Sequence, residues 1–386
     1  MQPFRVQVTQ SEIDDLKHRI SATRWPTEPS EVGWERGIPV DHLRELADYW
    51  LNEYDWRTAE AEINQFPQYT TEIDGATIHF LHVRSAEPSA TPVLLTHGWP
   101  GSFVEFLDVI RPLTDPEAYG GDAADAYHLV IPSLPGYGFS GPLSEPGWGN
   151  VRIAGAFAEL MSRLGYSRYV VQGGDLGALV ALTLAAVAPE NVRAAYVSML
   201  LTPPPDALDP TALTAEELAA LERLSRFLTD ETGYMKQQAT RPQTLAYGLT
   251  DSPVGQLAWI AEKFAQWTDW EKVPGDAISR DRLLTNVSAY WFTRTASSSA
   301  QLYYELAGIL PTSPSPSAPP PPLPTPLGVA VYPRDPSRPI RRDWAEPYFP
   351  NIIHWAEQPA GGHFAALERP GLFAADLWEF SRKING

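Results

Sequence analysis

The sequence predicts an α/β fold: a mostly parallel, doubly wound sheet with a helical cap and an N-terminal meander. Two observations point to this class. Short apolar runs typical of buried strands alternate with helical patterns in residues 71–201, and the alternation resumes in residues 327–386. Residues 202–310 carry helical patterns without strands, which indicates that a cap is inserted between two parts of one core.

The N-terminal region, residues 1–70, combines helical patterns with aromatic turns. A capping-box pattern at Ser11 predicts a helix that ends at Thr23, and apolar residues along one face predict a second helix over residues 41–54. Such a short meander cannot bury its own Trp and Phe side chains. We therefore expect it to pack on the core and on the cap.

The core elements are predicted from apolar runs and from the turns between them. The first two strands, residues 71–73 and 76–83, form a hairpin that turns at Asp74 and Gly75. The other strands are expected at residues 92–96, 128–132, 169–172, 194–199, 327–332 and 352–356. The helices are expected from residue 103, at residues 154–164, from the turn after residue 173 to residue 188, and at residues 370–381.

A proline-rich segment, residues 311–326, lies between the cap and the second part of the core. Consecutive prolines favour an extended, stiff chain, so this segment is expected to be a connector. A ligand for a proline-reading domain is the alternative interpretation.

Composition limits the partners and the location. The formal net charge of −18 disfavours nucleic acids and anionic membranes, because both would repel the protein. The chain has no cysteine, so disulfides and thiolate metal sites are excluded. No apolar run reaches the about 18 to 20 residues that span a bilayer. We expect a soluble, cytoplasmic protein that acts on a small neutral molecule.

One strand-to-helix turn presents a carboxylate. The apolar strand that starts at Tyr169 breaks at Gly173 and Gly174, presents Asp175, and continues as an apolar helix after Gly177. A nucleophile elbow needs small residues beside its tip, because the turn is tight and the tip residue is strained. A carboxylate at the tip can attack an sp³ carbon without a base. The alternative interpretation is an ordinary turn with an aspartate N-cap.

Two further polar residues follow late strands of the predicted core. Asp335 comes after one strand, and His363 follows the next, directly after a glycine pair. The chain order of nucleophile, acid and histidine is the order of the α/β-hydrolase fold. We therefore expect Asp175, Asp335 and His363 to form a triad, with Asp343 and Glu346 as alternative acids. An esterase is disfavoured because the chain lacks the Gly-x-Ser-x-Gly motif.

A loop that begins at His97 follows the strand at residues 92–96. The backbone amides of Trp99 and Leu176 are expected to form an oxyanion hole for a tetrahedral intermediate at the carboxyl carbon of Asp175. A role for Trp99 in the core is compatible with this interpretation.

The chain resembles the epoxide hydrolases of the microsomal type, within the α/β-hydrolase superfamily, over nearly its whole length, and it looks like a soluble microbial member. The motifs that carry the resemblance are Arg24-Trp25-Pro26, His97-Gly98-Trp99-Pro100-Gly101-Ser102, Gly173-Gly174-Asp175-Leu176-Gly177, Gly361-Gly362-His363-Phe364-Ala365-Ala366 and the cap segment that starts at Asp251. The chain departs from the family at Leu176, where many relatives carry Trp. It also has Asp335 where the membrane-bound animal branch tends to have Glu, and we expect no membrane anchor like the one of that branch.

The resemblance implies an acid pair in the cap. Tyr234 and Tyr303 are expected to protonate the epoxide oxygen, with Tyr304 as the alternative. Tyr304 and Trp99 are also expected to contact the substrate.

The implied reaction has two steps. Asp175 attacks an epoxide carbon to give a hydroxyalkyl ester, and His363, oriented by Asp335, activates the water that hydrolyses this ester to a vicinal diol. This reaction needs no metal and no organic cofactor. The expected partners are a small-molecule epoxide and water, and a homodimer is left open.

Two alternatives share the fold. A haloalkane dehalogenase-like hydrolase has the same nucleophile but binds halide with Trp or Asn donors, and a catalytically silent protein would bind its ligand without turnover. The paired tyrosines and the N-terminal meander favour the epoxide. The sequence does not specify the epoxide, the regio- and enantioselectivity, or a role in detoxification as opposed to biosynthesis.

Overall fold

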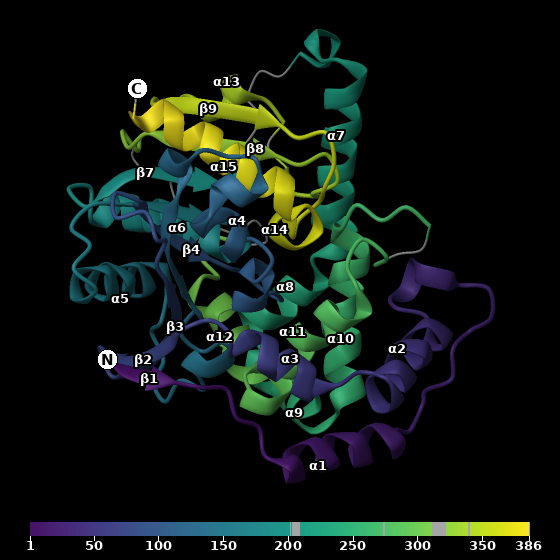
Figure 1. Cartoon of the computed structure of the whole chain (residues 1–386). Helices are drawn as coiled ribbons and strands as arrows, with labels where there is room; N and C mark the ends of the chain where they lie inside the picture. Colours follow the sequence, from purple (N-terminus) through teal and green to yellow (C-terminus); the bar gives the residue numbers. More distant parts are fainter. Residues whose placement is uncertain (201, 203–208, 273–274, 311–321, 339, 386) are drawn as a thin grey trace.

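One sheet of nine strands runs through the computed structural model, which describes residues 1–200, 202, 209–272, 275–310, 322–338 and 340–385 (Figure 1). The strands are β1 (Gln2–Phe4), β2 (Gln68–Ile73), β3 (Ala76–Val83), β4 (Thr91–Thr96), β5 (Tyr127–Pro132), β6 (Tyr169–Gly173), β7 (Val192–Val197), β8 (Leu327–Val331) and β9 (Ile352–Glu357). Their order across the sheet is β1-β2-β3-β5-β4-β6-β7-β8-β9.

The sheet is parallel over its greater part. Strands β5, β4, β6, β7, β8 and β9 are parallel to one another. Strand β3 pairs with β5 in the antiparallel direction, and β2 and β1 continue the sheet in antiparallel pairing. The core helices are α4 (Ile110–Thr114), α5 (Asn150–Arg163), α6 (Asp175–Val187), α13 (Arg342–Ala345), α14 (Ala365–Glu368) and α15 (Pro370–Asn385). The predicted α/β-hydrolase fold with a mostly parallel sheet is therefore confirmed.

The hairpin turn between β2 and β3 lies where the sequence predicts it. Asp74 and Gly75 both have positive φ, at 49° and 78°, as a two-residue hairpin turn requires. The prediction of an α-helix from residue 103 is wrong. A short 3₁₀ helix, η2 (Phe103–Phe106), comes first, and α4 begins only at Ile110. Pro112 explains the break, because it has no N–H to donate to an earlier turn of a continuous helix.

The N-terminal region forms α1 (Gln10–Ser21), α2 (Val40–Asn52) and α3 (Trp56–Ile63). The first helix begins two residues earlier than expected, because Thr9 and not Ser11 is its cap. The Thr9 hydroxyl accepts from the Glu12 amide, and the Glu12 carboxylate accepts from the Thr9 amide. The sequence also missed β1 and α3. Through β1, this region is part of the central sheet.

Side-chain contacts tie the N-terminal region to the inserted helices. The buried Trp50 indole donates to the Ser288 hydroxyl at 3.1 Å. Arg282 pairs with Glu62 of α3 at 2.9 Å and with Asp108 of the core at 2.7 Å. In Figure 1 the N-terminal helices accordingly lie beside α9, α10 and α11.

The inserted helices lie between β7 and β8 in the chain. They are α7 (Ala215–Arg226), α8 (Gly233–Thr240), α9 (Pro242–Asp251), α10 (Pro253–Trp267), α11 (Arg280–Thr293) and α12 (Ala296–Glu305), with a π-helical turn at Phe227–Glu231. Residues 311–321 of the predicted proline-rich connector lie outside the described residues. The domain limits expected from the sequence therefore stay predictions.

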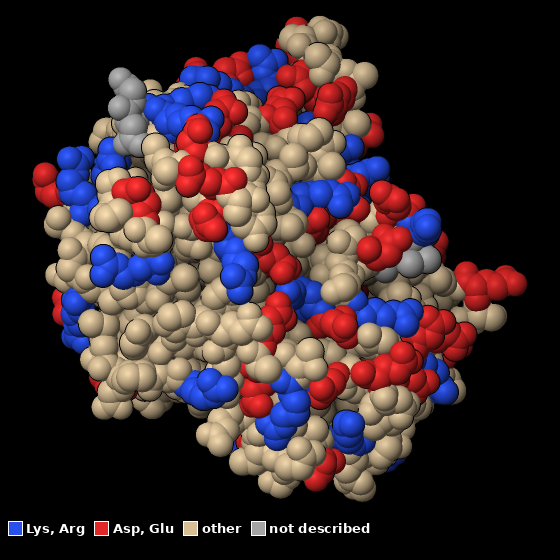
Figure 2. Space-filling view, viewed as in Figure 1, with Lys and Arg blue, Asp and Glu red and all other residues tan. Residues whose placement is uncertain are grey.

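The surface is charged and mixed. Figure 2 shows basic and acidic side chains interspersed over one face, with acidic side chains prominent in the region of α2. Among the helices that the structure describes, none is both long enough and apolar enough to cross a bilayer.

Close packing at the start of α6 makes a testable prediction. A Cβ atom at Gly177 would lie 2.2 Å from the carbonyl oxygen of Thr96, so Gly177→Ala must push α6 away from β4. We expect a loss of about 1–3 kcal/mol in the free energy of unfolding, the usual range for overpacking. Thermal unfolding measures it. Gly155→Ala in α5 is the matched control, because a Cβ there meets nothing within 4 Å. Equal melting temperatures for the two variants would contradict this account.

Candidate active site

The turn between β6 and α6 holds Asp175 in strained geometry. Asp175 has a φ of 50°, in the left-handed region that an aspartate rarely adopts. The flanking positions leave no room for side chains: a Cβ at Gly173 would lie 2.2 Å from the carbonyl oxygen of Gly177. The local geometry is that of a nucleophile elbow, and it presents the carboxylate at the carboxyl end of the sheet.

The three residues of the expected triad lie together. His363 Nδ1 is 3.2 Å from Asp335 Oδ2, and His363 Nε2 is 3.3 Å from Asp175 Oδ2. Asp335 is held in turn by the amide and the hydroxyl of Ser337, at 2.8 and 2.7 Å. The alternative acids lie elsewhere: Asp343 pairs with Arg341, and Glu346 pairs with Arg342.

Burial and the neighbouring charges have opposite effects on the pKa values of His363 and Asp335. Burial disfavours the imidazolium form of His363, but the carboxylates of Asp335 and Asp175 favour it more strongly, so the pKa of His363 is raised well above its usual value. Burial likewise opposes ionisation of Asp335, but His363 and the two Ser337 donors outweigh it, and the pKa of Asp335 is lowered. In the free protein the site therefore favours a cationic imidazole between two carboxylates.

Trp99 contributes to the site through its backbone and through its ring. Its amide donates to Asp175 Oδ1 at 2.9 Å, so this amide already lies against a carboxylate oxygen. Leu176, the next residue after Asp175, is buried in the first turn of α6. The role of the Leu176 amide in an oxyanion hole stays a prediction.

Two buried tyrosines reach the site from the inserted helices. Tyr234 of α8 stacks on Trp99 with ring centroids 4.9 Å apart, and Tyr303 of α12 packs edge-on against the same indole at 5.8 Å. Burial raises the pKa of both hydroxyl groups well above 10, so both keep their protons at neutral pH. Tyr304 is 55% exposed, which does not fit the substrate contact expected for it.

A buried cation next to Tyr234 was missed from the sequence. Lys263 Nζ lies over the ring of Tyr234 at 4.9 Å and pairs with Glu262 at 3.3 Å. Burial lowers the pKa of this ammonium group. Lys263 lies on α10, and the amphipathic pattern of a helix gives no sign that one of its lysines points inward.

A small cavity adjoins Asp175. It offers about 20 Å³ to the centre of a water-sized sphere, and its polar lining includes Glu105, Gln172, Ser198 and His363. Glu105 and Gln172 were not predicted as site residues. Glu105 lies far from Asp175 in the chain, so no local pattern could indicate that Glu105 and Asp175 line the same cavity.

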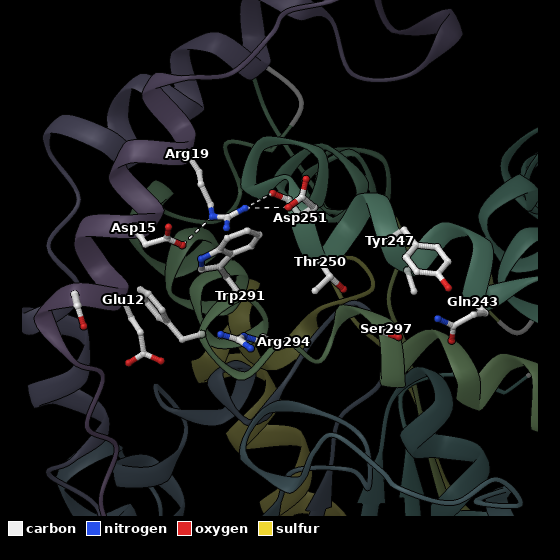
Figure 3. Close-up of a pocket in the computed structure, with 13 residues that line it drawn as sticks. Glu12, Asp15, Arg19, Gln243, Tyr247, Thr250, Asp251, Trp291, Arg294 and Ser297 are labelled. Carbon is white, nitrogen blue, oxygen red and sulfur yellow. Dashed lines mark hydrogen bonds and ion pairs between the residues drawn. The ribbon is translucent and has the colours of Figure 1, made fainter.

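A second, larger groove lies on the surface. It encloses about 920 Å³ between α1 and the helices α9, α11 and α12, where Arg19 pairs with Asp15 and Asp251 (Figure 3). None of the described residues that line it belongs to the predicted site. The size of a cavity therefore does not identify the active site of this protein, whereas the polar groups that converge around Asp175 do.

Comparison with known proteins agrees with this geometry. The family described as "Epoxide hydrolase N terminus" matches residues 1–106, and the one described as "alpha/beta hydrolase fold" matches residues 91–229. A candidate epoxide hydrolase of Stigmatella aurantiaca is 48% identical over 99% of this chain and 85% of its own length. The chain belongs to the epoxide hydrolase family.

Other members support the assignment over the whole chain. Epoxide hydrolase 1 of Oryctolagus cuniculus is 34% identical to this epoxide hydrolase, over 98% of this chain and 88% of its own length. The solved structure of Aspergillus niger epoxide hydrolase superposes with a TM-score of 0.87 at 34% identity, over 99% of this chain and 96% of that one. Juvenile hormone epoxide hydrolase of the silkworm Bombyx mori gives a TM-score of 0.87 at 32% identity, over 100% and 94%. The family expected from the motifs is confirmed.

The ion pair between His363 and Asp175 makes a testable prediction. Asp175→Asn removes one of the two carboxylates that favour the imidazolium, so the pKa of His363 must fall. Nitrogen NMR of the imidazole, assigned with a His363→Gln sample, measures the change. Asp14→Asn, which removes an exposed carboxylate of α1, should leave the pKa of His363 unchanged. An unchanged pKa in Asp175→Asn would contradict the proposed ion pair.

Proposed function

We propose that this epoxide hydrolase converts a small-molecule epoxide to a vicinal diol through a covalent ester on Asp175. The observation that carries the proposal is the position of the Asp175 carboxylate. The backbone amide of Trp99 holds one of its oxygens at 2.9 Å, and the other lies 3.3 Å from His363 Nε2, at the tip of a strained turn.

The first step opens the epoxide ring. An oxygen of the Asp175 carboxylate forms a bond to an epoxide carbon, and the bond from that carbon to the ring oxygen breaks. Tyr234 and Tyr303 donate hydrogen bonds to the ring oxygen, and one of them gives it a proton. The raised pKa of both tyrosines supports this role, because each hydroxyl still carries its proton when the substrate arrives.

The second step hydrolyses the ester. His363 takes a proton from water while the water oxygen attacks Cγ of Asp175, and the amides of Trp99 and Leu176 hold the oxyanion. On collapse the bond from Cγ to the alkoxide oxygen breaks, and the alkoxide takes the remaining proton of the added water, which gives the diol and restores the carboxylate. The proton on His363 returns through solvent to the tyrosine. Once Asp175 is esterified its charge is lost, which lowers the pKa of His363 toward that of a base. Side chains, backbone amides and water suffice for both steps.

The proposed division of the chain fits these roles. Residues 71–201 and 327–386 would be the core that supplies the triad, and residues 202–310 would be the cap that supplies the tyrosines. Residues 1–70 would be the meander that packs on both, and residues 311–326 the connector. Contacts of the N-terminal helices with α10 and α11 support this arrangement.

Removal of the base should trap the ester. His363→Gln leaves the Asp175 nucleophile in place, so the first step should proceed, but the water would have no proton acceptor. Intact-protein mass spectrometry after mixing with styrene oxide should show one added substrate mass, located by proteolysis on the peptide that holds Asp175.

Two controls complete this experiment. Asp175→Ala should give no adduct, and His18→Gln, at an exposed position of α1, should turn over like the unaltered protein. An unmodified His363→Gln protein that nevertheless binds substrate would mean that His363 acts before ring opening, and the two-step proposal would be wrong.

Loss of either cap tyrosine should slow ring opening. Tyr234→Phe and Tyr303→Phe each remove one donor to the ring oxygen, so each should reduce the alkylation rate by roughly ten- to several-hundred-fold, and the double variant should be nearly inactive. Rapid-quench kinetics measure the rate. The exposed Tyr304 offers the matched control, and Tyr304→Phe should have little effect. A large loss in Tyr304→Phe and none in Tyr303→Phe would move the assignment by one residue.

A further inference from the structure

The cavity beside Asp175 has the size of a single water molecule. A buried site needs at least 10–15 Å³, measured for the centre of a water-sized sphere, to hold one water, and this cavity offers about 20 Å³. A substrate cannot fit in so small a space. Its lining nevertheless includes both groups that act in the second step of the proposed reaction, Asp175 and His363.

Two side chains that line this cavity have buried polar atoms that can take a further partner. Gln172 Oε1 has no hydrogen-bond partner among the described residues, and His363 Nε2 makes no hydrogen bond there beyond its ion-pair contact of 3.3 Å with Asp175 Oδ2. Gln172 is only 2% exposed. An unpaired buried acceptor costs free energy, so such atoms are normally partnered by protein groups or by bound water. A water in this cavity would satisfy both atoms at once.

Glu105 brings a third polar group to the same cavity. The amide of Ser102 donates to its carboxyl group, and a side chain at Gly101 would collide with Glu105 Oε1. Glu105 is thus folded back over the loop that also carries Trp99. Burial, and to a lesser degree the charge of Asp175, raises the pKa of Glu105 to about 8 against the opposing effect of His363, so the group is mostly protonated at neutral pH.

We propose that this cavity binds the hydrolytic water, and that Gln172 and Glu105 are positioning residues for the second step. This inference rests on the function proposed above. Once the ester has formed and His363 is neutral, a water molecule has two protons for the two acceptors, His363 Nε2 and Gln172 Oε1. Its oxygen can accept one bond from the protonated Glu105 and still direct a lone pair at Cγ of Asp175. On attack, the proton toward His363 is transferred and the new bond to Cγ forms.

Single-turnover kinetics separate this role from a structural one. Quenched samples with styrene oxide give the rate of ester formation and the rate of ester decay, both by mass spectrometry. Gln172→Met and Glu105→Leu should form ester within about twofold of the unaltered rate, and should lose it about tenfold more slowly, the effect of one hydrogen bond. Glu105→Gln keeps a donor at the same place and should restore most of the decay rate. Glu117→Gln, at an exposed site, is the control for a glutamate replaced outside the cavity and should leave both rates unchanged.

The outcomes distinguish this inference from the proposed function. If His363→Gln accumulates ester while Gln172→Met hydrolyses it at the unaltered rate, the inference is wrong and the proposed function stands. If His363→Gln accumulates no ester, the proposed function itself fails. Equal slowing of both steps, or equal losses from Glu105→Gln and Glu105→Leu, would indicate a structural role and overturn the inference.

A high-resolution crystal structure of the unaltered protein tests for the bound water without any variant. We expect an ordered water within hydrogen-bond distance of His363 Nε2 and Gln172. A well-defined cavity without such a water would overturn the inference.

Discussion

The close contact of β6 and α6 with the end of β4 is the constraint on which the rest of this structure depends. The Thr96 hydroxyl of β4 shares its one proton between the carbonyl oxygens of Gln172 and Gly177, at 2.7 and 3.0 Å, and so ties the two sides of the turn to one point. The absence of a side chain at Gly177 allows this approach. Asp175 has to take up a positive φ as a result, and its carboxylate is held clear of the sheet.

Charge balance at the turn follows from burial. A carboxylate in a buried site is stable only when donors or cations offset the loss of water. At Asp175 the Trp99 amide and the His363 imidazole provide this compensation, and at Asp335 the imidazole and Ser337 provide it. The same contacts orient His363 between the two acids. Stabilisation of the resting site and preparation for the proposed second step thus use the same atoms.

The Trp99 loop is fixed from the side of the inserted helices. In α11, Asn286 donates to the carbonyl oxygen of Pro100 at 2.8 Å, and Tyr290 donates to that of Gly101 at 2.7 Å. The N-terminal helices in turn hold α11 through Trp50. The N-terminal region therefore stabilises the position of the Trp99 amide indirectly, which gives a physical reason for its presence in an enzyme whose reacting groups lie elsewhere.

The sequence by itself determined the α/β class, the elbow and the three residues that lie together at its tip, because each depends on local order along the chain. Glycines beside Asp175 indicate a tight turn wherever it lies, and the order Asp175, Asp335, His363 follows from the order of the strands. Only the tertiary structure decided which groups share one buried space. Lys263 over Tyr234, and Glu105 and Gln172 beside His363, lie on elements that no local pattern connects. Their proximity and burial, and hence their charge states, arise from packing between distant segments.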